Sequence, residues 1–176
     1  MLRVWDPLVR IFHWSLVASF ATAWFTSSSR DETHQWIGLA AAMLIAFRLL
    51  WGFVGTPYAR FSQFIRRPSA VINYLIDILK NREARYIGHN PAGGMMALAL
   101  LTSISGTAFT GWLMTTDAWY GEEAMQIIHS AFAYATVFLV AGHLTGVILA
   151  SYRHKENLVK AMVTGKKRPA EPIDVN

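Results

Sequence analysis

The stretch that decides the fold is residues 127–152, IIHSAFAYATVFLVAGHLTGVILASY, which contains no Asp, Glu, Lys or Arg. A helix that crosses the hydrocarbon core of a membrane needs roughly 20 mostly apolar residues, so this run is long enough. His129 and His143 are 14 positions apart in it, which places them within roughly 40° of the same helix face and roughly 21 Å apart along the axis. Two metal ligands at that spacing would serve two separate sites, one near each membrane surface.

Three further apolar runs lie at about 8–26, 36–54 and 95–115. The 176 residues are 53% hydrophobic and only 15% charged, against about a quarter charged in a soluble domain. We therefore predict an all-α integral membrane protein over residues 1–176, a four-helix bundle in up-down-up-down order. Residues 21–23, Ala-Thr-Ala, imitate a signal-peptide cleavage site, but the apolar run continues beyond them and we expect no cleavage.

Charge predicts the orientation of the spans. Lys and Arg concentrate in the N-terminus, the connection 55–94 and the tail 153–176, whereas the loops after the first and third spans are acidic, with Asp31, Glu32, Asp117, Glu122 and Glu123 against one basic residue, Arg30. The positive-inside rule then places both termini and the connection on the cytoplasmic side of the membrane. The net charge of +5 thus indicates topology rather than a nucleic-acid partner.

The connection 55–94 is long enough to need structure of its own. After Pro68, apolar residues recur at helical spacing: Val71, Ile72, Leu75, Ile78 and Leu79. This pattern predicts an amphipathic helix that either lies on the cytoplasmic membrane surface or caps the bundle. We expect the last ten residues to fray.

Histidine must carry any metal chemistry, because the chain has no cysteine for disulfides, iron–sulfur clusters or covalent haem attachment. In the antiparallel topology, His13 and His143 share the cytoplasmic level, and His34 and His129 share the outer level. Two pairs of histidines stacked across a membrane are what two b-type haems require, since each iron takes one imidazole on each axial face. The alternative is a haem-free anchor or small transporter whose histidines are interfacial or belong to a proton path.

Arg48 is the other ionisable residue inside a span, and it lies 14 positions after His34. It either pairs with a haem propionate near the cytoplasmic level or extends to the cytoplasmic headgroups. Small residues near the histidines and in the third span would make room for a haem or pack helices together: Gly38, Ser103, Ser105, Gly106, Gly111, Gly142 and Gly146.

Short motifs extend over nearly the whole chain: Trp5-Asp6-Pro7-Leu8-Val9-Arg10, Phe12-His13-Trp14, His34-x-Trp36-x-Gly38, Arg48-Leu49-Leu50-Trp51-Gly52-Phe53, Gly88-His89-Asn90-Pro91-Ala92-Gly93-Gly94, Thr110-Gly111-Trp112 and His154-x-Glu156-Asn157-Leu158. In these motifs the chain resembles the bacterial cytochrome b561 family, which includes the cytochrome b subunits of nickel-iron hydrogenases. The resemblance implies a four-helix bundle in the inner membrane of a bacterium, with two non-covalent b haems ligated by His13, His34, His129 and His143. The residues themselves assign no role to the loop 88–94.

The chain has no nucleophile motif and no flavin or nicotinamide fingerprint, so we expect an electron-transfer subunit rather than a stand-alone enzyme. The resemblance implies quinone as the lipid-soluble partner and a redox protein, a hydrogenase or a periplasmic c-type cytochrome, as the other. Arg48, His89 and Asn90 are candidates for a quinone pocket. The sequence leaves open quinone-linked oxidoreductase activity, reduction of a small oxidant such as superoxide, the direction of electron flow, and whether the chain forms a homodimer.

Overall fold

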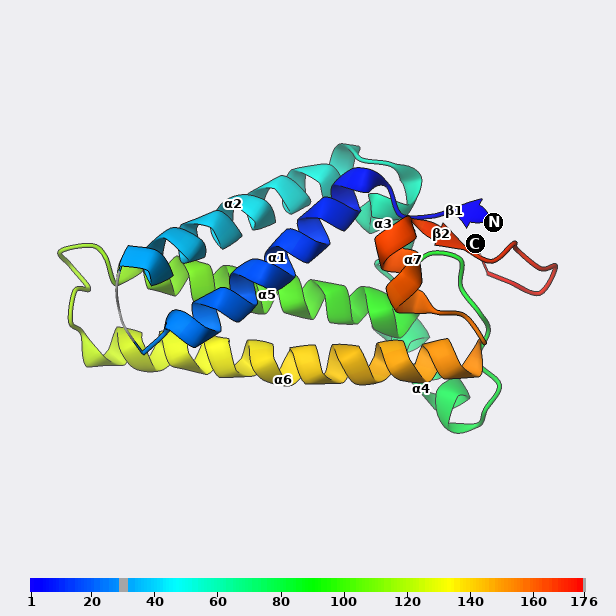
Figure 1. Cartoon of the computed structure of the whole chain (residues 1–176). Coiled ribbons are helices and arrows are strands. Elements are labelled where there is room, and N and C mark those ends of the chain that lie inside the picture. The colour runs from blue at the N-terminus through cyan, green and yellow to red at the C-terminus, as the bar shows by residue number, and fades with distance from the viewer. Residues whose placement is uncertain (29–31, 176) are drawn as a thin grey trace. The chain divides into compact units, whose positions relative to one another are not determined.

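The computed structural model describes residues 1–28 and 32–175, and this part of the chain is mostly helical (Figure 1). Seven α-helices, one 3-10 helix and two short strands occur in it, in the order β1 (Leu2–Arg3), α1 (Pro7–Thr26), α2 (Glu32–Val54), η1 (Pro57–Ala59), α3 (Phe61–Phe64), α4 (Pro68–Leu79), α5 (Pro91–Leu113), α6 (Glu123–Arg153), α7 (Leu158–Thr164) and β2 (Lys166–Lys167). The loop residues Arg30 and Asp31 lie outside the described residues.

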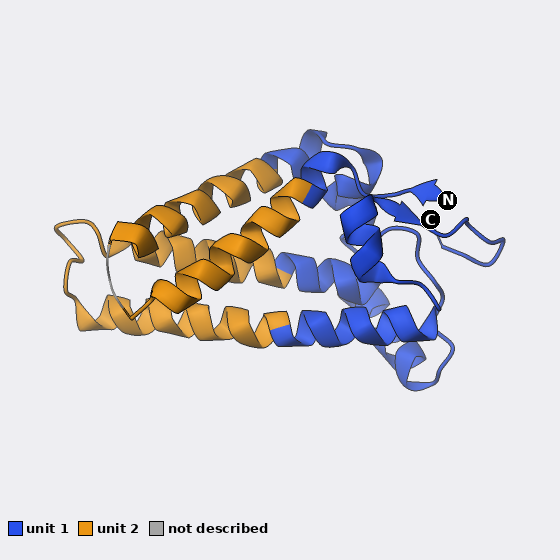
Figure 2. Cartoon of the chain, in the orientation of Figure 1, with its two compact units in different colours: residues 1–10, 50–98, 141–176 blue, residues 11–49, 99–140 orange. Residues whose placement is uncertain are grey.

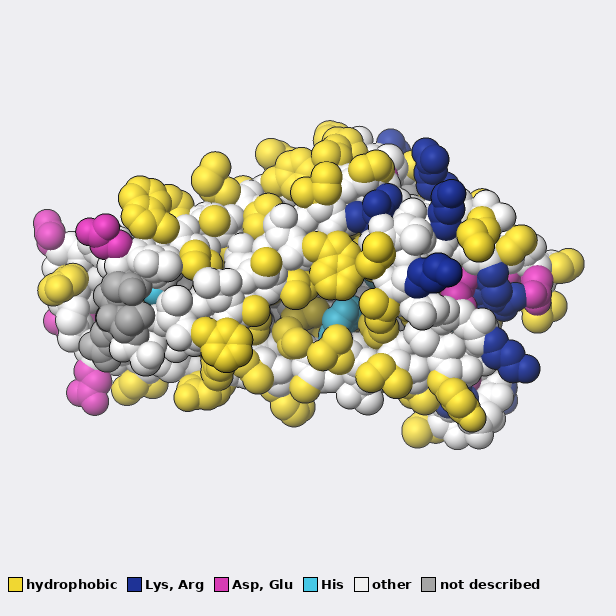
Figure 3. All heavy atoms as spheres, viewed as in Figure 1, with side chains coloured by type: hydrophobic (Ala, Val, Ile, Leu, Met, Phe, Trp, Pro, Cys, Tyr) yellow, Lys and Arg dark blue, Asp and Glu magenta, His cyan; other side chains and the backbone are white. Residues whose placement is uncertain are grey.

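Four helices, α1, α2, α5 and α6, are long and apolar enough to cross a membrane, as the hydropathy predicts. Only 6% of the most apolar window of α6 is buried, and its exposed side chains include Tyr134, Phe138 and Ile148. Figure 3 shows apolar side chains over much of the face in view. A helix that exposes apolar side chains in this way is suited to lipid rather than to water.

Several helices begin at a proline or directly after a capping side chain, and not at the first apolar residue. α2, α5 and α6 each start four residues before the predicted apolar run, because helix geometry continues beyond the hydrocarbon. Pro7, Pro68 and Pro91 occupy first helical positions, where a missing N–H costs nothing. α4 confirms the helix expected after Pro68.

The chain divides into two compact units, coloured in Figure 2. Unit 2 comprises Ile11–Leu49 and Ala99–Val140. Its interior is polar in places: Thr136 is completely buried, and its hydroxyl lies 2.8 Å from that of Ser103. Gly106 is close to the Phe132 ring, with no room for a β-carbon. Small residues therefore let α5 and α6 approach closely here.

Unit 1 comprises Met1–Arg10, Leu50–Leu98 and Ala141–Asn176. Its core joins residues that are far apart in sequence: Val4, Trp5, Val9, Ala59, Ile87 and Ala161. Asp6 organises this unit, because one carboxylate oxygen accepts from the Val9 backbone at 3.0 Å and the other from Thr56 at 2.6 Å and Trp51 at 3.3 Å. Burial raises the pKa of Asp6, but these hydrogen bonds outweigh it and hold the pKa below its usual value.

The expectation of a frayed C-terminus is wrong for the residues up to 175. β2 pairs with β1 in antiparallel register, Leu2 with Lys167, and Val175 forms a parallel bridge with Tyr86. Arg85 binds the carboxylates of Glu156 and Asp174. The tail is polar in sequence, so hydropathy does not reveal that its charged residues find buried partners.

Candidate functional site

Two of the four predicted histidines lie together in unit 2. His34 is in the first turn of α2 and His129 is in the second turn of α6. Both are half-buried. Their ring centroids are 6.3 Å apart and the ring planes are inclined by 77°. The structure therefore brings together the pair that was predicted to share the outer level.

The hydrogen bonds of His34 fix its tautomer. Its Nδ1 lies 3.0 Å from the backbone carbonyl of Ala23. A carbonyl can only accept, so Nδ1 carries the proton and donates. The Nε2 atom of a neutral ring then carries the lone pair, which is the form that ligates a metal.

His129 has the same tautomer for a related reason. Its Nδ1 lies 3.1 Å from the hydroxyl of Thr110, and that hydroxyl lies 2.7 Å from the carbonyl of Gly106. The hydroxyl has one proton, which it donates to the carbonyl, so it accepts from Nδ1 of His129. Nε2 of His129 is thereby also the nitrogen with the lone pair.

The spacing of the two rings fits a single metal ion between them. When a metal ion bridges two imidazoles on opposite sides, bonds of about 2 Å and ring centres about 1 Å behind each nitrogen put the centroids about 6 Å apart. The observed 6.3 Å agrees with this value. Two histidines at this spacing could hold the iron of a haem b, so the residues present fit the group that the sequence implies.

Two glycines border this histidine pair. A β-carbon on Gly111 would lie 3.1 Å from Cε1 of His129, which is tighter than an ordinary contact. Gly38 lies one turn after His34 and has open space where its β-carbon would be. Gly111 therefore makes room for the imidazole, whereas no contact requires a glycine at position 38. Gly106 and Ser103 serve helix packing instead.

His13 and His143 belong to different units, so their pairing stays a prediction. His13 lies on α1, half-buried, with its ring edge-on to Trp14 at a centroid distance of 5.0 Å. His143 lies on α6 and is also half-buried. Beside it, a β-carbon on Gly142 would lie 3.3 Å from the terminal methyl of Met96.

Arg48 lies in α2 with only 5% of its surface exposed. An arginine that extends to the headgroups would expose its guanidinium, so this burial disfavours that reading. A buried guanidinium inside a span marks a functional position by default. Its assignment to a haem propionate stays a prediction.

The loop 88–94 has a structural role that the sequence did not reveal. The Asn90 side chain accepts from the Gly93 backbone at 2.7 Å and so caps α5, which begins at Pro91. The His89 ring packs between Trp5 and Phe64, at centroid distances of 4.8 and 4.6 Å. The amide oxygen of Asn90 is therefore committed to capping, and the place of Asn90 and His89 in a quinone pocket stays a prediction.

Sequence reasoning also missed the groups that orient the two histidines. Thr110 was part of a quoted motif, Thr110-Gly111-Trp112, so a signal was present without an assigned role. The Ala23 carbonyl has no signature in the sequence, because any residue supplies a backbone oxygen.

Comparison with known proteins supplies the remaining evidence. A family profile described as prokaryotic cytochrome b561 matches residues 4–165. Searches of curated proteins and of solved structures gave no significant match.

Proposed function

The chain belongs to the prokaryotic cytochrome b561 family, and from this premise we propose that it carries single electrons across the membrane through two non-covalent haem b groups, each held by two histidines. The family implies a multi-pass bacterial membrane protein, a b-type cytochrome that binds haem b and transfers electrons. The observation that carries the finer proposal is the His34–His129 pair, with both Nδ1 atoms donating and a centroid spacing of 6.3 Å. We assign His13 and His143 to the second haem.

A haem held by these histidines would supply a reversible one-electron carrier. The residues of this chain would hold the haem and set the properties of its ligands. The Ala23 carbonyl and the Thr110 hydroxyl each accept from an imidazole N–H, which fixes the ring orientation and makes the ligand more basic. Arg48, buried within its span, offers a guanidinium to a propionate.

For topology, we propose one transmembrane domain with four spans in up-down-up-down order and both termini in the cytoplasm. All basic residues except Arg30 and Arg48 belong to unit 1, which also contains both termini. This distribution supports a cytoplasmic side for unit 1. The exposed apolar side chains of α4, Ile72, Leu75, Ile76 and Leu79, support a helix that lies on the inner membrane surface rather than one that caps the bundle.

For partners, we propose the membrane quinone pool and a redox protein, either a periplasmic c-type cytochrome or a hydrogenase. Acidic residues in unit 2, among them Glu32, Asp117 and Glu123, complement a basic protein surface.

Proteoliposomes test the proposed function directly. Ferricyanide is trapped inside, dithionite is added outside, and loss of ferricyanide absorbance reports electrons that cross the membrane. We expect the wild-type protein to accelerate this loss, and His129→Ala to abolish the acceleration. His154→Gln is the matched control, because it removes a histidine that we assign to neither haem. A haem-replete protein that transfers no faster than empty liposomes would contradict the proposal.

Replacing dithionite by a short-chain quinol then tests the quinone partner separately. Transfer with dithionite but not with quinol would retain the electron path and exclude quinone. A protein that is folded and binds no haem would instead favour the anchor or transporter.

A further inference from the structure

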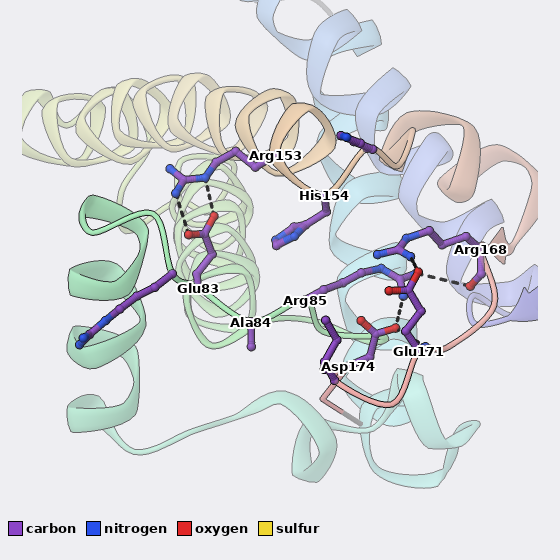
Figure 4. A pocket seen from close by; sticks show the side chains of 11 residues that line it. Glu83, Ala84, Arg85, Arg153, His154, Arg168, Glu171 and Asp174 are labelled. Atoms are coloured by element: carbon purple, nitrogen blue, oxygen red, sulfur yellow. Dashed lines mark hydrogen bonds and ion pairs between the residues drawn. The ribbon is translucent and has the colours of Figure 1, made fainter.

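A cleft in unit 1 combines basic side chains with the end of a membrane span. It has a volume of about 590 Å³, and Figure 4 shows it from close by. Its basic lining residues are Arg82, Arg85, Arg153, Lys155 and Arg168, and its acidic ones are Glu83, Glu171 and Asp174. We call it the basic cleft. Arg153 is the last residue of α6, so the basic cleft lies at the end of a helix that is long and apolar enough to span a membrane.

Most of these cations have partners. Arg153 binds the Glu83 carboxylate at 2.7 Å and the Asn81 side chain at 2.8 Å. Arg85 is held by Glu156 and Asp174, and Arg168 by Glu171. These pairs build the walls of the cleft and contribute little net charge.

Two donors in the cleft lack an acceptor. Lys155 is exposed, and no carboxylate of residues 1–28 and 32–175 lies within 4 Å of its ammonium group. The Nε atom of Arg168 is buried and has no hydrogen-bond partner within the same residues. Arg82 adds a third accessible cation, because its ion pair with Asp77 is solvent-exposed and therefore weak.

The backbone at Lys155 fixes the position of this lysine. Its φ is +50°, a left-handed conformation that glycine adopts freely and lysine only at a cost. The Glu156 N–H donates to the Ser151 carbonyl across this residue at 3.1 Å, so Lys155 is the left-handed residue that ends α6, and this turn brings Lys155 into the lining of the basic cleft.

Helix α4 leads directly to the basic cleft. Its exposed side chains Ile72, Leu75, Ile76 and Leu79 recur at positions i, i+3, i+4 and i+7, so they form one apolar stripe. Arg82, three residues after Leu79, lines the cleft. An apolar stripe beside accessible cations matches a molecule that has both acyl chains and a phosphate.

We propose that the basic cleft binds the phosphate of an anionic phospholipid, with the acyl chains of that lipid against α4. Lys155 and Arg82 are the accessible cations for the phosphate. Free phosphate offers the same anionic chemistry, but it lacks the apolar part that the α4 stripe would contact. Basic pockets at the cytoplasmic ends of spans are suited to lipid headgroups for these reasons.

His154 gives the basic cleft a dependence on pH. Its ring lies between Glu83 and Arg85 (Figure 4), and the charged groups that act on it are Glu83, Arg85, Arg153 and Arg168. Burial lowers the pKa of His154 and the three arginines lower it further, whereas the Glu83 carboxylate raises it. A bound phosphate favours the protonated ring, so lipid binding should be tighter at pH 6 than at pH 8.

The experiment uses the full chain, loaded with haem, in nanodiscs of phosphatidylcholine to which phosphatidylglycerol is added. Bound lipid is counted by native mass spectrometry, and thermal unfolding is followed in parallel. We expect phosphatidylglycerol to be retained and to raise the unfolding temperature. Lys155→Gln should weaken the apparent affinity about fivefold. Lys160→Gln removes the same charge from α7 outside the basic cleft and should leave the affinity unchanged.

A second variant separates binding from folding. Lys155→Gly relieves the left-handed backbone, so it should be at least as stable as the wild type without added lipid and yet bind phosphatidylglycerol as weakly as Lys155→Gln. His154→Gln should remove the difference between pH 6 and pH 8. Equal binding by the Lys155 and Lys160 variants would overturn the site. Equal retention of phosphatidylglycerol and phosphatidylcholine, or full displacement of lipid by millimolar inorganic phosphate, would overturn the lipid assignment.

Discussion

Replacing Thr110 by valine removes the hydroxyl that accepts a hydrogen bond from Nδ1 of His129 at 3.1 Å. Valine has nearly the same shape, so the change isolates the hydrogen bond. Thr110 is only 5% exposed, and water cannot easily replace its hydroxyl. The imidazole N–H then loses its acceptor in a buried site.

The expected size follows from that burial. Leaving a buried donor without a partner costs about 1–3 kcal/mol, and loss of a group that orients a metal ligand lowers metal affinity by about 10- to 100-fold. The hydrogen bond also makes the imidazole more basic and so favours the ferric state. Without it, a difference of about 1 kcal/mol between oxidation states would raise the haem potential by about 40 mV.

The assay is a redox titration of the reduced-haem absorbance band, together with haem transfer to an apo-acceptor protein as a measure of affinity. Thr110→Ser keeps the hydroxyl and should behave as the wild type. Thr107→Val, one turn earlier, removes a hydroxyl that donates to the Ser103 carbonyl and should change neither quantity. Unchanged potential and haem affinity in Thr110→Val would refute the assigned tautomer and the role of this hydroxyl.

Three other changes probe the site and the fold. Gly111→Ala places a β-carbon 3.1 Å from the His129 ring, so we expect a lower haem content per chain in the visible spectrum, with the helices intact by circular dichroism. Glu156→Gln breaks a buried pair with Arg85 and should cost about 3 kcal/mol of unfolding free energy at pH 7. Burial raises the pKa of Glu156, but the hydrogen bond from Arg85 outweighs burial and the pKa is lowered. The wild type should therefore lose the stability that this ion pair contributes as the pH falls below about 4.5. In thermal melts, the unfolding temperature of the variant should depend less on pH than that of the wild type. Gly165→Ala, at φ +77° and with a backbone carbonyl 2.6 Å from the new β-carbon, should lower the unfolding temperature by several degrees.

The four spans could be predicted from the sequence because the hydrocarbon core imposes both length and apolarity on each helix. The ends of those helices could not be predicted, because the residues that cap a helix lie outside its apolar run. Asn90 shows this: its side chain starts α5 four residues before the run predicted from hydropathy. Asn is a common capping residue, but many Asn residues cap no helix, so its presence in the sequence does not by itself mark a helix start.

The proximity of His34 and His129 could be predicted from depth matching, which takes successive spans to run antiparallel. What depth could not supply was the orientation of each ring. That depends on a backbone carbonyl for His34 and on the Thr110 hydroxyl for His129, and both contacts join residues whose proximity only the folded chain creates.

The C-terminal segment was mispredicted for a different reason. Its many charged residues predict a segment that is exposed to solvent. Lys167 is nevertheless only 6% exposed, because its ammonium group lies near Glu156 and over the Trp5 ring. Burial lowers the pKa of Lys167 to about 8, against the opposing effect of Glu156. Charged residues with well-placed partners can be buried, and composition does not reveal such partners.

The most direct test of the central claim is a pyridine haemochrome assay with protein quantification on the purified chain and its histidine variants. The account predicts two haem b groups per wild-type chain. His34→Ala, His129→Ala and their double variant should each retain one haem, and His154→Ala should retain two. A folded, haem-replete wild type with fewer than two haems, or a His34/His129 double variant that loses both, would contradict the account.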